Sequence, residues 1–578
     1  MGRAGALEVQ KTLWGFDGHV VPGYFSPLSL LVSNPGDRPF DGDLTCTEMA
    51  GLAGQRGAEY LQPVYLAPHT ARWVQFQIFF QNAQSEIEVS WGRGGGERLK
   101  NEAGVVTGPP ACVWLYDESN PFAQIGGFKF FPDALFPTTA AATDGLDAVV
   151  LNYAPRWEPA RRDAFLDWIK SGGTVHLLRG ADGKFPVFSE SLAPLNISGA
   201  RSRIGSGMVV RHDVASREMT PPYLAQHGFL PRTLKQDQNT SVYDLENALF
   251  QKLSRLTRPD IGWGLISVIS LVYLALMGPT HYFWRRKLDY RLSILAFLGS
   301  VAVFGGMFAV VGRRGYNESQ TVHSLAIARS LGGGRCDVTQ WISAFATSGD
   351  VYMLSHTASA NIYAAPSSEA VRGRVLNGKD GQFVADIPLY SSVAFTHRAV
   401  MEGDDTSVMV EKWEVTGSAV SALRLKPGPR FPKDVIEMRF RYGDTIRQLV
   451  RKGNAFEFDA SDLTPAKTAN LKVTTRVETL KDFLSADKLR NASQVNWYGN
   501  YPENAGEPQK LEDALPLLYA RALGLLGSSA QILSERPMPA DMLQLFVAAQ
   551  SPDGFRLKGK GFDRETGCVL YIQDVYKR

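Results

Sequence analysis

Two apolar stretches decide the fold that this sequence predicts: IGWGLISVISLVYLALMGPTHYF at residues 261–283 and LSILAFLGSVAVFGGMFAVV at residues 292–311. Neither stretch contains Asp, Glu, Lys or Arg, and a helix needs about 20 apolar residues to cross the hydrocarbon core of a bilayer. We therefore predict a transmembrane helical hairpin over residues 261–311. The alternative is a helical hairpin buried in the core of a large soluble protein.

The side chains that flank these stretches are of the kinds that collect at a membrane surface. Four basic residues lie in the short link between the stretches, and five lie within about 15 residues of the membrane on the other side. The density of positive charge favours a cytoplasmic link, so the large domains on both sides are predicted to be extracytoplasmic. The predicted interface residues are Trp263, Tyr282, Trp284, Arg285, Arg286 and Lys287.

The composition limits the classes of function. A chain of 578 residues should contain several domains, at roughly 150 residues each. The net charge of +3, without a run rich in Lys or Arg, gives no indication of nucleic-acid binding. The four cysteines form no CxxC pair and the nine histidines form no ligand motif, so we predict no metal site and no cofactor. No signal peptide opens the chain: either the first domain is cytoplasmic, or a signal has been removed or is missing.

Two regions are typical of β structure. Residues 8–97 contain short strands that alternate apolar and polar side chains, such as Val74–Ile78, and predict an immunoglobulin-like β-sandwich. Residues 320–475 predict a β-rich domain, because Ile436–Tyr442 alternates in the same way and returns through Ile446–Val450 as a hairpin.

The last region, residues 476–578, predicts a helical insertion into that β-rich domain, or a cap on it. Leu511–Leu526 has the pattern of a helix, and the apolar stretch Met542–Ala549 is predicted as a second helix. Cys568–Val575 is predicted as a closing strand.

Residues 111–215 predict an α/β domain. Leu146–Leu151 and Thr174–Leu178 are continuous apolar strands, which indicates a sheet covered on both faces. A helix between them begins near Pro159 and ends at Gly172-Gly173. Strand, helix and strand at this spacing predict a right-handed βαβ unit in a parallel sheet.

Residues 216–260 form a predicted helical connector. Leu245, Leu249 and Leu253 lie along one face of a helix over Val242–Leu256. This face could lie on the membrane surface or pack on the preceding domain, and the pattern fits both.

The α/β region resembles the class I glutamine amidotransferase-like fold in residues 147–153 and 168–176. In that fold a nucleophilic Cys follows the strand that corresponds to Thr174–Leu178. Here Arg179-Gly180-Ala181-Asp182-Gly183 occupies that place, and Cys112 lies in an apolar strand that would bury its thiol. The resemblance therefore implies the fold and argues against the chemistry, and no catalytic residue is predicted. Candidate ligand-facing residues in loops that follow the strands are Asp117, Glu118, Arg179 and Asp182.

The apolar stretches resemble a pattern in uncharacterised bacterial membrane proteins that couple an amidotransferase-like domain to two spans. The matching residues are Tyr273-Leu274-Ala275-Leu276-Met277-Gly278-Pro279 and Arg285-Arg286-Lys287. The resemblance implies a cleaved signal upstream, extracytoplasmic flanking domains and a place in the bacterial inner (cytoplasmic) membrane. Related proteins tend to be encoded beside MoxR-type ATPases and von Willebrand A-domain membrane proteins, or beside transporter components, which implies protein partners in the envelope.

The sequence thus predicts a multidomain α+β membrane protein, and two hypotheses for its function follow. The first is a membrane-anchored, non-catalytic extracytoplasmic protein that binds or scaffolds other envelope components. The second is an envelope hydrolase or amidotransferase with a non-standard site near Asp117 and Glu118. A deep polar pocket around Arg179–Gly183 with a convergent acid, base and nucleophile would favour the enzyme, and a filled or flat surface would favour the binder.

Overall fold

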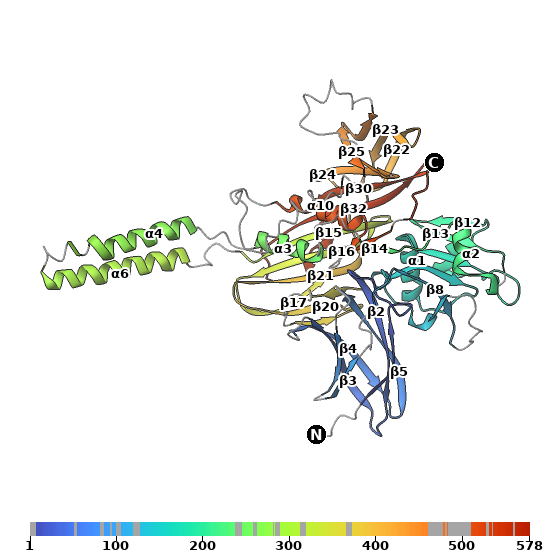
Figure 1. Ribbon diagram of the computed structural model, residues 1–578, viewed down its shortest axis with the longest axis horizontal. Helices are drawn as coiled ribbons and strands as arrows, with labels where there is room; N and C mark the ends of the chain where they lie inside the picture. Colours follow the sequence, from blue (N-terminus) through green and yellow to red (C-terminus); the bar gives the residue numbers. More distant parts are fainter. Residues whose placement is uncertain are drawn as a thin grey trace.

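Strands dominate the computed structural model (Figure 1): of the residues that the structure describes, 48% are in strands and 22% in helices. The predicted class, a multidomain α+β membrane protein with two transmembrane helices, is therefore wrong, because the molecule consists mostly of β-sheets. The structure describes residues 7–50, 55–80, 86–92, 95–99, 106–118, 128–214, 216–236, 245–257, 263–280, 282–283, 289–312, 319–365, 373–460, 478–479, 483, 510–526, 531–534, 536–558 and 561–577.

A 12-stranded sheet forms the centre of the molecule. Its strands follow the spatial order β18 (Ile362–Ala364), β21 (Ser391–Glu402), β16 (Arg335–Ala346), β15 (Thr321–Gly332), β32 (Arg564–Tyr576), β30 (Met542–Gln550), β24 (Val435–Tyr442), β25 (Thr445–Lys452), β26 (Ala455–Asp459), β23 (Ala419–Pro427) and β22 (Val408–Thr416), with β27 (Glu478–Thr479) beside β25. Only β15 and β32 among these neighbours run parallel. The predicted hairpin at residues 436–450 is confirmed in β24 and β25.

Strand β30 corrects one prediction, because the sequence predicts a helix over Met542–Ala549. Both faces of β30 are buried: Phe546 packs in the core that contains the helix α10 (Leu515–Ala522), and Leu545 packs in the core on the other side. A strand covered on both faces is apolar throughout, and its pattern does not differ from that of a short buried helix. The region predicted as a cap therefore supplies two strands, β30 and β32, to the middle of the central sheet.

An eight-stranded sheet joins parts of the chain that the sequence assigns to separate domains. Its spatial order is β31 (Leu557–Lys558), β17 (Asp350–His356), β20 (Gln382–Ile387), β19 (Gly373–Leu376), β4 (Gln55–Leu66), β3 (Phe40–Ala50), β6 (Glu86–Trp91) and β7 (Gly95–Leu99). Since β19 and β4 pair in parallel, this sheet crosses both the predicted 8–97 sandwich and the predicted 320–475 domain. A smaller sheet of β1 (Glu8–Trp14), β2 (Tyr24–Asn34) and β5 (Thr70–Phe80) shares one hydrophobic core with it.

The α/β unit contains a six-stranded sheet in the order β12 (Arg201–Ile204), β13 (Gly207–Arg211), β11 (Thr174–Leu177), β10 (Leu146–Leu151), β8 (Ala111–Tyr116) and β9 (Lys129–Pro132). All neighbours are parallel except β12 and β13. The helix α1 (Pro159–Lys170) connects the parallel strands β10 and β11, so the predicted strand–helix–strand unit is confirmed. Phe165 and Trp168 of α1 cover one face, and Leu224 of α2 (Pro221–Gln226) packs on the other, which explains the unbroken apolar strands.

The helix α3 (Leu245–Thr257) lies against strands β15 and β16 of the central sheet. Its residues Leu245, Leu249 and Leu253 are fully buried, in the same core as Trp341. The sequence left open whether this apolar face lies on the membrane surface or packs on the preceding domain. In the structure it packs on protein, namely on the central sheet and not on the preceding α/β unit. A three-stranded sheet pairs β14 (Leu234–Gln236), which precedes α3 in the chain, with β29 (Gln531–Leu533) and β28 (Leu525–Leu526), which follow α10.

Short helical turns complete the description. They are η1 (Asp133–Leu135), η2 (Ala140–Ala142), η3 (Glu190–Leu195), η4 (Ser216–Glu218), η7 (Leu511–Ala514) and η8 (Asp553–Phe555). The predicted helix over Leu511–Leu526 is therefore divided into η7, α10 and the strand β28.

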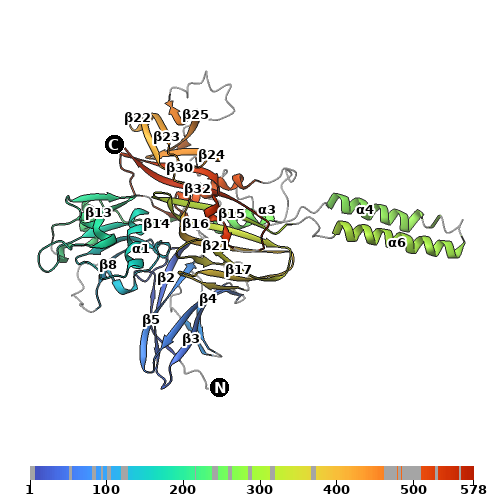
Figure 2. The ribbon, with the colours of Figure 1, turned by 180° about the vertical axis from the view of Figure 1, so that it is seen from behind.

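Two apolar helices, α4 (Trp263–Ala275) and α6 (Tyr290–Gly312), project from the body as an arm (Figure 1). Figure 2 shows from behind that the arm and the α/β unit lie at opposite ends of the molecule. The two helices lie side by side, and the rings of Tyr273 and Phe304 are 5.2 Å apart.

The prediction of two transmembrane helices over residues 261–311 is corrected by the lengths of these helices. In the described ranges only one helix, α6 over Tyr290–Phe308, is long and apolar enough to cross a membrane. The regular part of α4 has 13 residues, or roughly 20 Å, and then changes to a π-helical turn at Leu276–Thr280. Pro279 lies in that turn, and proline removes a backbone donor and clashes with the preceding turn of a helix.

Candidate functional site

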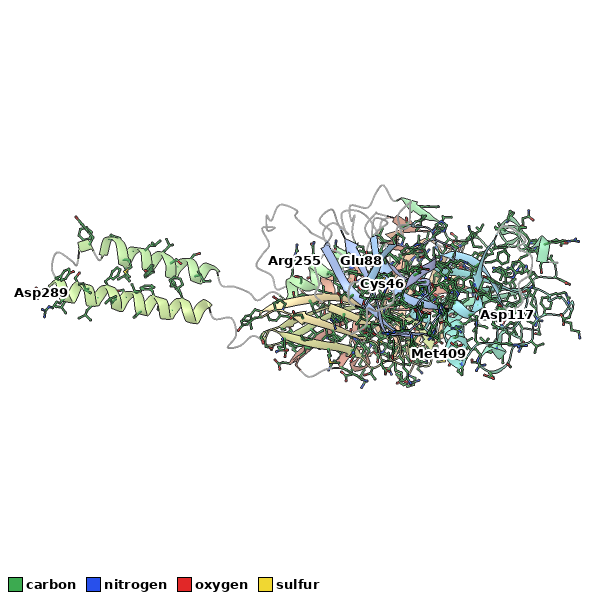
Figure 3. The ribbon with its side chains drawn as sticks, turned by 90° about the horizontal axis from the view of Figure 1, so that it is seen from below. Cys46, Glu88, Asp117, Arg255, Asp289 and Met409 are labelled. Atoms are coloured by element: carbon green, nitrogen blue, oxygen red, sulfur yellow. The ribbon has the colours of Figure 1, made fainter. Side chains whose placement is uncertain are left out.

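The carboxyl edge of the parallel sheet holds the four residues that the sequence predicts to face a ligand. Asp117 and Glu118 follow β8, whereas Arg179 and Asp182 follow β11. Because β8 and β11 are separated by β10, the two pairs start roughly 10 Å apart across the sheet. Asp117 is half-buried and the other three are exposed. Figure 3 shows Asp117 on the part of the body that is far from the arm.

The segment after β11 is a closed surface turn. The Arg179 guanidinium contacts the Asp213 carboxylate at 2.5 Å and donates to the Gly183 carbonyl at 2.8 Å. The Asp182 carboxylate accepts a hydrogen bond from the backbone N–H of Lys184 at 3.0 Å, and the Gly180 N–H donates to the Lys184 carbonyl at 2.8 Å. These polar groups stabilise the turn itself. The turn contains no nucleophilic side chain, and its surface is exposed.

Asp133 and Tyr153 also lie at this edge, and the sequence analysis did not identify them. Asp133 follows β9 and Tyr153 follows β10, and the Tyr153 hydroxyl donates to the Asp133 carboxylate at 2.8 Å. Burial raises the pKa of Asp133, and the nearby charge of Asp117 adds to this, while the hydrogen bond from Tyr153 opposes it. The three side chains form a small acidic cluster that can accept hydrogen bonds. No sequence pattern indicates Asp133, because the strand β9 that it follows has four residues and is too short to recognise by pattern.

The cysteine thiols are poor nucleophiles in this structure. All four are free, and burial raises the pKa of each of them, to about 12 for Cys336 and for Cys568. Cys112, in β8, is partly exposed and not fully buried as predicted, although desolvation by the surrounding protein raises the pKa of its thiol. Among the described residues, no three His, Cys, Asp or Glu side chains are grouped so that they could hold a metal ion.

The arm exposes an unusual amount of apolar surface. Only 11% of the apolar stretch Tyr290–Phe308 is buried, so the body of the protein does not cover α6. The exposed large apolar side chains of the arm are Val268, Leu271, Val272, Leu274, Tyr282, Phe283, Tyr290, Leu292, Ile294, Leu295, Phe297, Leu298, Val301, Val303 and Met307. An exposed apolar surface of this extent marks a membrane or protein contact.

The predicted interface residues lie at the two ends of this arm where the structure describes them. Trp263 is the first residue of α4, at the end next to the body. Tyr282 is exposed near the far end, where Figure 3 shows Asp289 at the tip. Trp284, Arg285, Arg286 and Lys287 lie outside the described residues.

Comparisons with known proteins add little to this geometry. A family model described as a domain of unknown function (DUF8726) matches residues 9–104, and among curated proteins none matches the chain. A cycloisomaltooligosaccharide glucanotransferase of Paenibacillus sp., complexed with cycloisomaltoheptaose, is similar at 16% identity over 25% of this chain and 20% of its own, with a TM-score of 0.15. A β-glucuronidase from glycoside hydrolase family 2 has 8% identity over 99% of this chain and 62% of its own, with a TM-score of 0.13. This chain thus spans less than two thirds of either protein, and what these comparisons establish is a match between its first 100 or so residues and a domain of unknown function.

Proposed function

We propose that this protein is a membrane-anchored, non-catalytic protein that binds or scaffolds other proteins beside the membrane. The apolar arm carries the proposal. It projects from a folded body, its large apolar side chains face outward, and α6 is long enough to cross a bilayer. These three observations together support a lipid environment for the arm.

The energy of lipid insertion for this surface is large. Fifteen large apolar side chains of the arm are exposed, and each would contribute roughly 1–2 kcal/mol on leaving water, since each is already partly covered. The sum is on the order of 15–30 kcal/mol, which exceeds the stability of a typical folded domain at about 5–15 kcal/mol. An arm of this kind in water would drive aggregation, and in a bilayer it anchors the body.

The body supports binding more than catalysis. The turn at Arg179–Gly183 carries no nucleophile, three of the four cysteines are buried while Cys112 is partly exposed, and Asp117 and Arg179 follow strands that are not neighbours. The resemblance to bacterial membrane proteins suggests the inner membrane as its location and an ATPase of the MoxR type, a von Willebrand A-domain protein or a transporter as the partner class.

Flotation with lipid vesicles tests the anchoring. The full chain is reconstituted into vesicles of phosphatidylethanolamine and phosphatidylglycerol, then floated on a density gradient after a high-salt wash. We expect the wild type to float and Leu295→Glu/Leu298→Glu, in the exposed face of α6, to stay with the soluble fraction. Leu389→Glu, which charges a similarly exposed leucine of the body, is the matched control and should float. A double variant that floats as well as the wild type would show that lipid does not hold the arm.

A further inference from the structure

A cavity of about 690 Å³ lies between the α/β unit and the central sheet. On one side it is lined by the amino ends of parallel strands, including Asp147 of β10 and Thr174 of β11. On the other side it is lined by residues of the central sheet, including Arg329 of β15 and Arg398 of β21. Its volume is within the usual range for small-molecule sites, about 300–1,000 Å³.

The lining is cationic. Eight arginines and four aspartates line the cavity, together with no lysine or glutamate, which gives a formal charge of +4 with the histidines neutral. Two of these arginines, Arg203 and Arg521, also pair with the carboxylates of Asp541 and Glu246 outside the lining, which lowers the balance to +2. The guanidinium group is planar and forms paired hydrogen bonds with carboxylate and phosphate, so a wall of arginines favours an oxyanion over a halide or a neutral sugar. We call this space the arginine cavity.

Part of this charge is neutralised within the protein and holds the cavity walls in place. Arg232 and Arg536 contact the Asp147 carboxylate at 2.6 and 2.9 Å, and burial, which alone would raise the pKa of Asp147, is outweighed by these two cations so that its pKa is lowered. Arg398 lies 2.5 Å from Asp144 and 2.9 Å from Asp337. The Arg398–Asp144 pair connects the α/β unit to the central sheet.

Other cationic and polar groups of the wall have no such partner. In the part of the chain that the structure describes, no carboxylate lies within ion-pair distance of Arg201 or Arg329. Three buried nitrogen atoms of lining side chains also have no hydrogen-bond partner among the described residues: Nε2 of His176, Nη1 of Arg521 and Nε of Arg536. Buried polar atoms without partners are rare in native structures, and each one indicates a group that the protein itself does not supply.

The histidines of the wall are suited to neutral hydrogen bonding. His176 is 1% exposed, and its Nδ1 lies 3.0 Å from Nε2 of His212. Burial lowers the pKa of both rings, to about 4 for His212, and the neighbouring Arg201 lowers them further. When Nδ1 of His176 accepts the proton of His212, Nε2 of His176 carries a proton that it can donate to a ligand.

We infer that the arginine cavity binds a small organic anion with carboxylate or phosphate groups. The arginines without a carboxylate partner supply the charge, although Arg201 donates to the His227 carbonyl, and the buried unpartnered nitrogens supply donors that an oxyanion would satisfy. The site lies at the amino ends of the strands, so it is separate from Asp117 and Arg179 at the carboxyl edge. A ligand in this site would contact both the α/β unit and the central sheet, so the packing of these two parts should depend on whether the ligand is bound. The inference does not depend on the membrane anchoring proposed above.

Calorimetric titration of the full chain in detergent, at low ionic strength, tests the inference with two probes, citrate and inorganic pyrophosphate. We expect at least one probe to bind at one molecule per chain. Binding of citrate alone identifies a carboxylate ligand, binding of pyrophosphate alone identifies a phosphate ligand, and binding of both supports the shared oxyanion chemistry.

Two variants locate the binding. Arg329→Gln should lower the affinity for the bound probe by about tenfold or more, because a charge-assisted hydrogen bond is lost. Arg329→Lys, which keeps the charge, should lower the affinity less. Arg217→Gln is the matched control: it removes the same charge from an exposed arginine of the α/β unit that does not line the cavity. Unchanged melting temperatures show that the variants are folded. The inference is overturned if neither probe binds, or if Arg329→Gln and Arg217→Gln weaken binding equally.

Discussion

Removing the Arg398 guanidinium should destabilise the contact between the α/β unit and the central sheet. Arg398 lies in β21 and contacts Asp337 of β16 and Asp144, which precedes β10. The side chains are 11%, 6% and 9% exposed, so Arg398→Met would leave two buried carboxylates without their cation. Breaking a buried ion pair by removing one partner costs about 3–5 kcal/mol. We therefore expect Arg398→Met to lower the free energy of unfolding by about that amount.

The pH dependence of this loss follows from Asp144. Burial raises the pKa of Asp144 to about 6 although Arg398 opposes the shift, and the pKa should rise further when Arg398 is removed. A carboxyl whose folded pKa lies above its unfolded pKa gains stability as the pH falls through that window, because the folded state binds the proton more tightly. The cost of Arg398→Met should therefore be largest near pH 8 and smaller near pH 5.

Urea unfolding of the full chain in detergent, followed by tryptophan fluorescence at both pH values, measures the loss. Arg374→Met is the matched control: Arg374 is 67% exposed and lies 3.7 Å from Glu59, so it should cost at most about 1 kcal/mol. The triple variant Arg398→Met/Asp144→Asn/Asp337→Asn removes both carboxylates together with the cation and should recover most of the stability. A cost below about 1 kcal/mol for Arg398→Met, or a triple variant no more stable than the single one, would refute the reasoning.

Three further predictions concern the interior of the body. Leu249→Ala, in the fully buried face of α3, should lower the free energy of unfolding in urea by about 2–5 kcal/mol. Leu274→Ala in the exposed arm is the control and should leave the unfolding of the body unchanged. Equal effects of the two substitutions would contradict the packing of α3. Glu565→Gln should flatten the dependence of the free energy of unfolding on pH. Burial raises the pKa of Glu565 from 4.5 to about 7, so the wild type should lose up to about 3 kcal/mol of unfolding free energy as the pH rises through that range. Thermal melts that show the same pH dependence for both proteins would contradict this prediction. Gly207→Ala should prevent stable folding of the α/β unit, because its Cβ would lie 2.0 Å from the Ile169 carbonyl oxygen, whereas Gly199→Ala, whose nearest atom is 3.9 Å away, should have little effect in limited proteolysis.

The sequence identified the candidate edge of the α/β sheet only in part. Asp117 and Glu118 were found because they follow β8, a strand with a recognisable apolar run, and Arg179 was found because it follows β11 in the same way. Asp133 was missed because β9 has four residues and then enters a 3₁₀ turn. A short strand has no periodic pattern, so its carboxyl end cannot be placed from neighbouring residues.

The arginine cavity could not have been predicted from local patterns. Its arginines come from the strands β12, β15, β21 and β24, from the helix α10 and from loops as late as Arg536, and each lies in ordinary sequence. Only the packing of the α/β unit against the central sheet brings their side chains to one space. The prediction of two transmembrane helices was wrong because hydropathy reports which residues are apolar but not where a regular helix ends. The regular helix α4 ends at Ala275, before the π-helical turn that contains Pro279.

The sequence by itself determined features that depend on residues close together in the chain. These are the apolar character of residues 261–311, the apolar face of α3, the β24–β25 hairpin and the βαβ unit around α1. Tertiary structure alone decided that β19 pairs with β4, that β30 is a strand in the middle of the central sheet, and that the arginines share one cavity. The physical reason is the range of the interactions: periodicity records which face of an element is buried, whereas strand partners and shared cavities depend on side chains hundreds of residues apart.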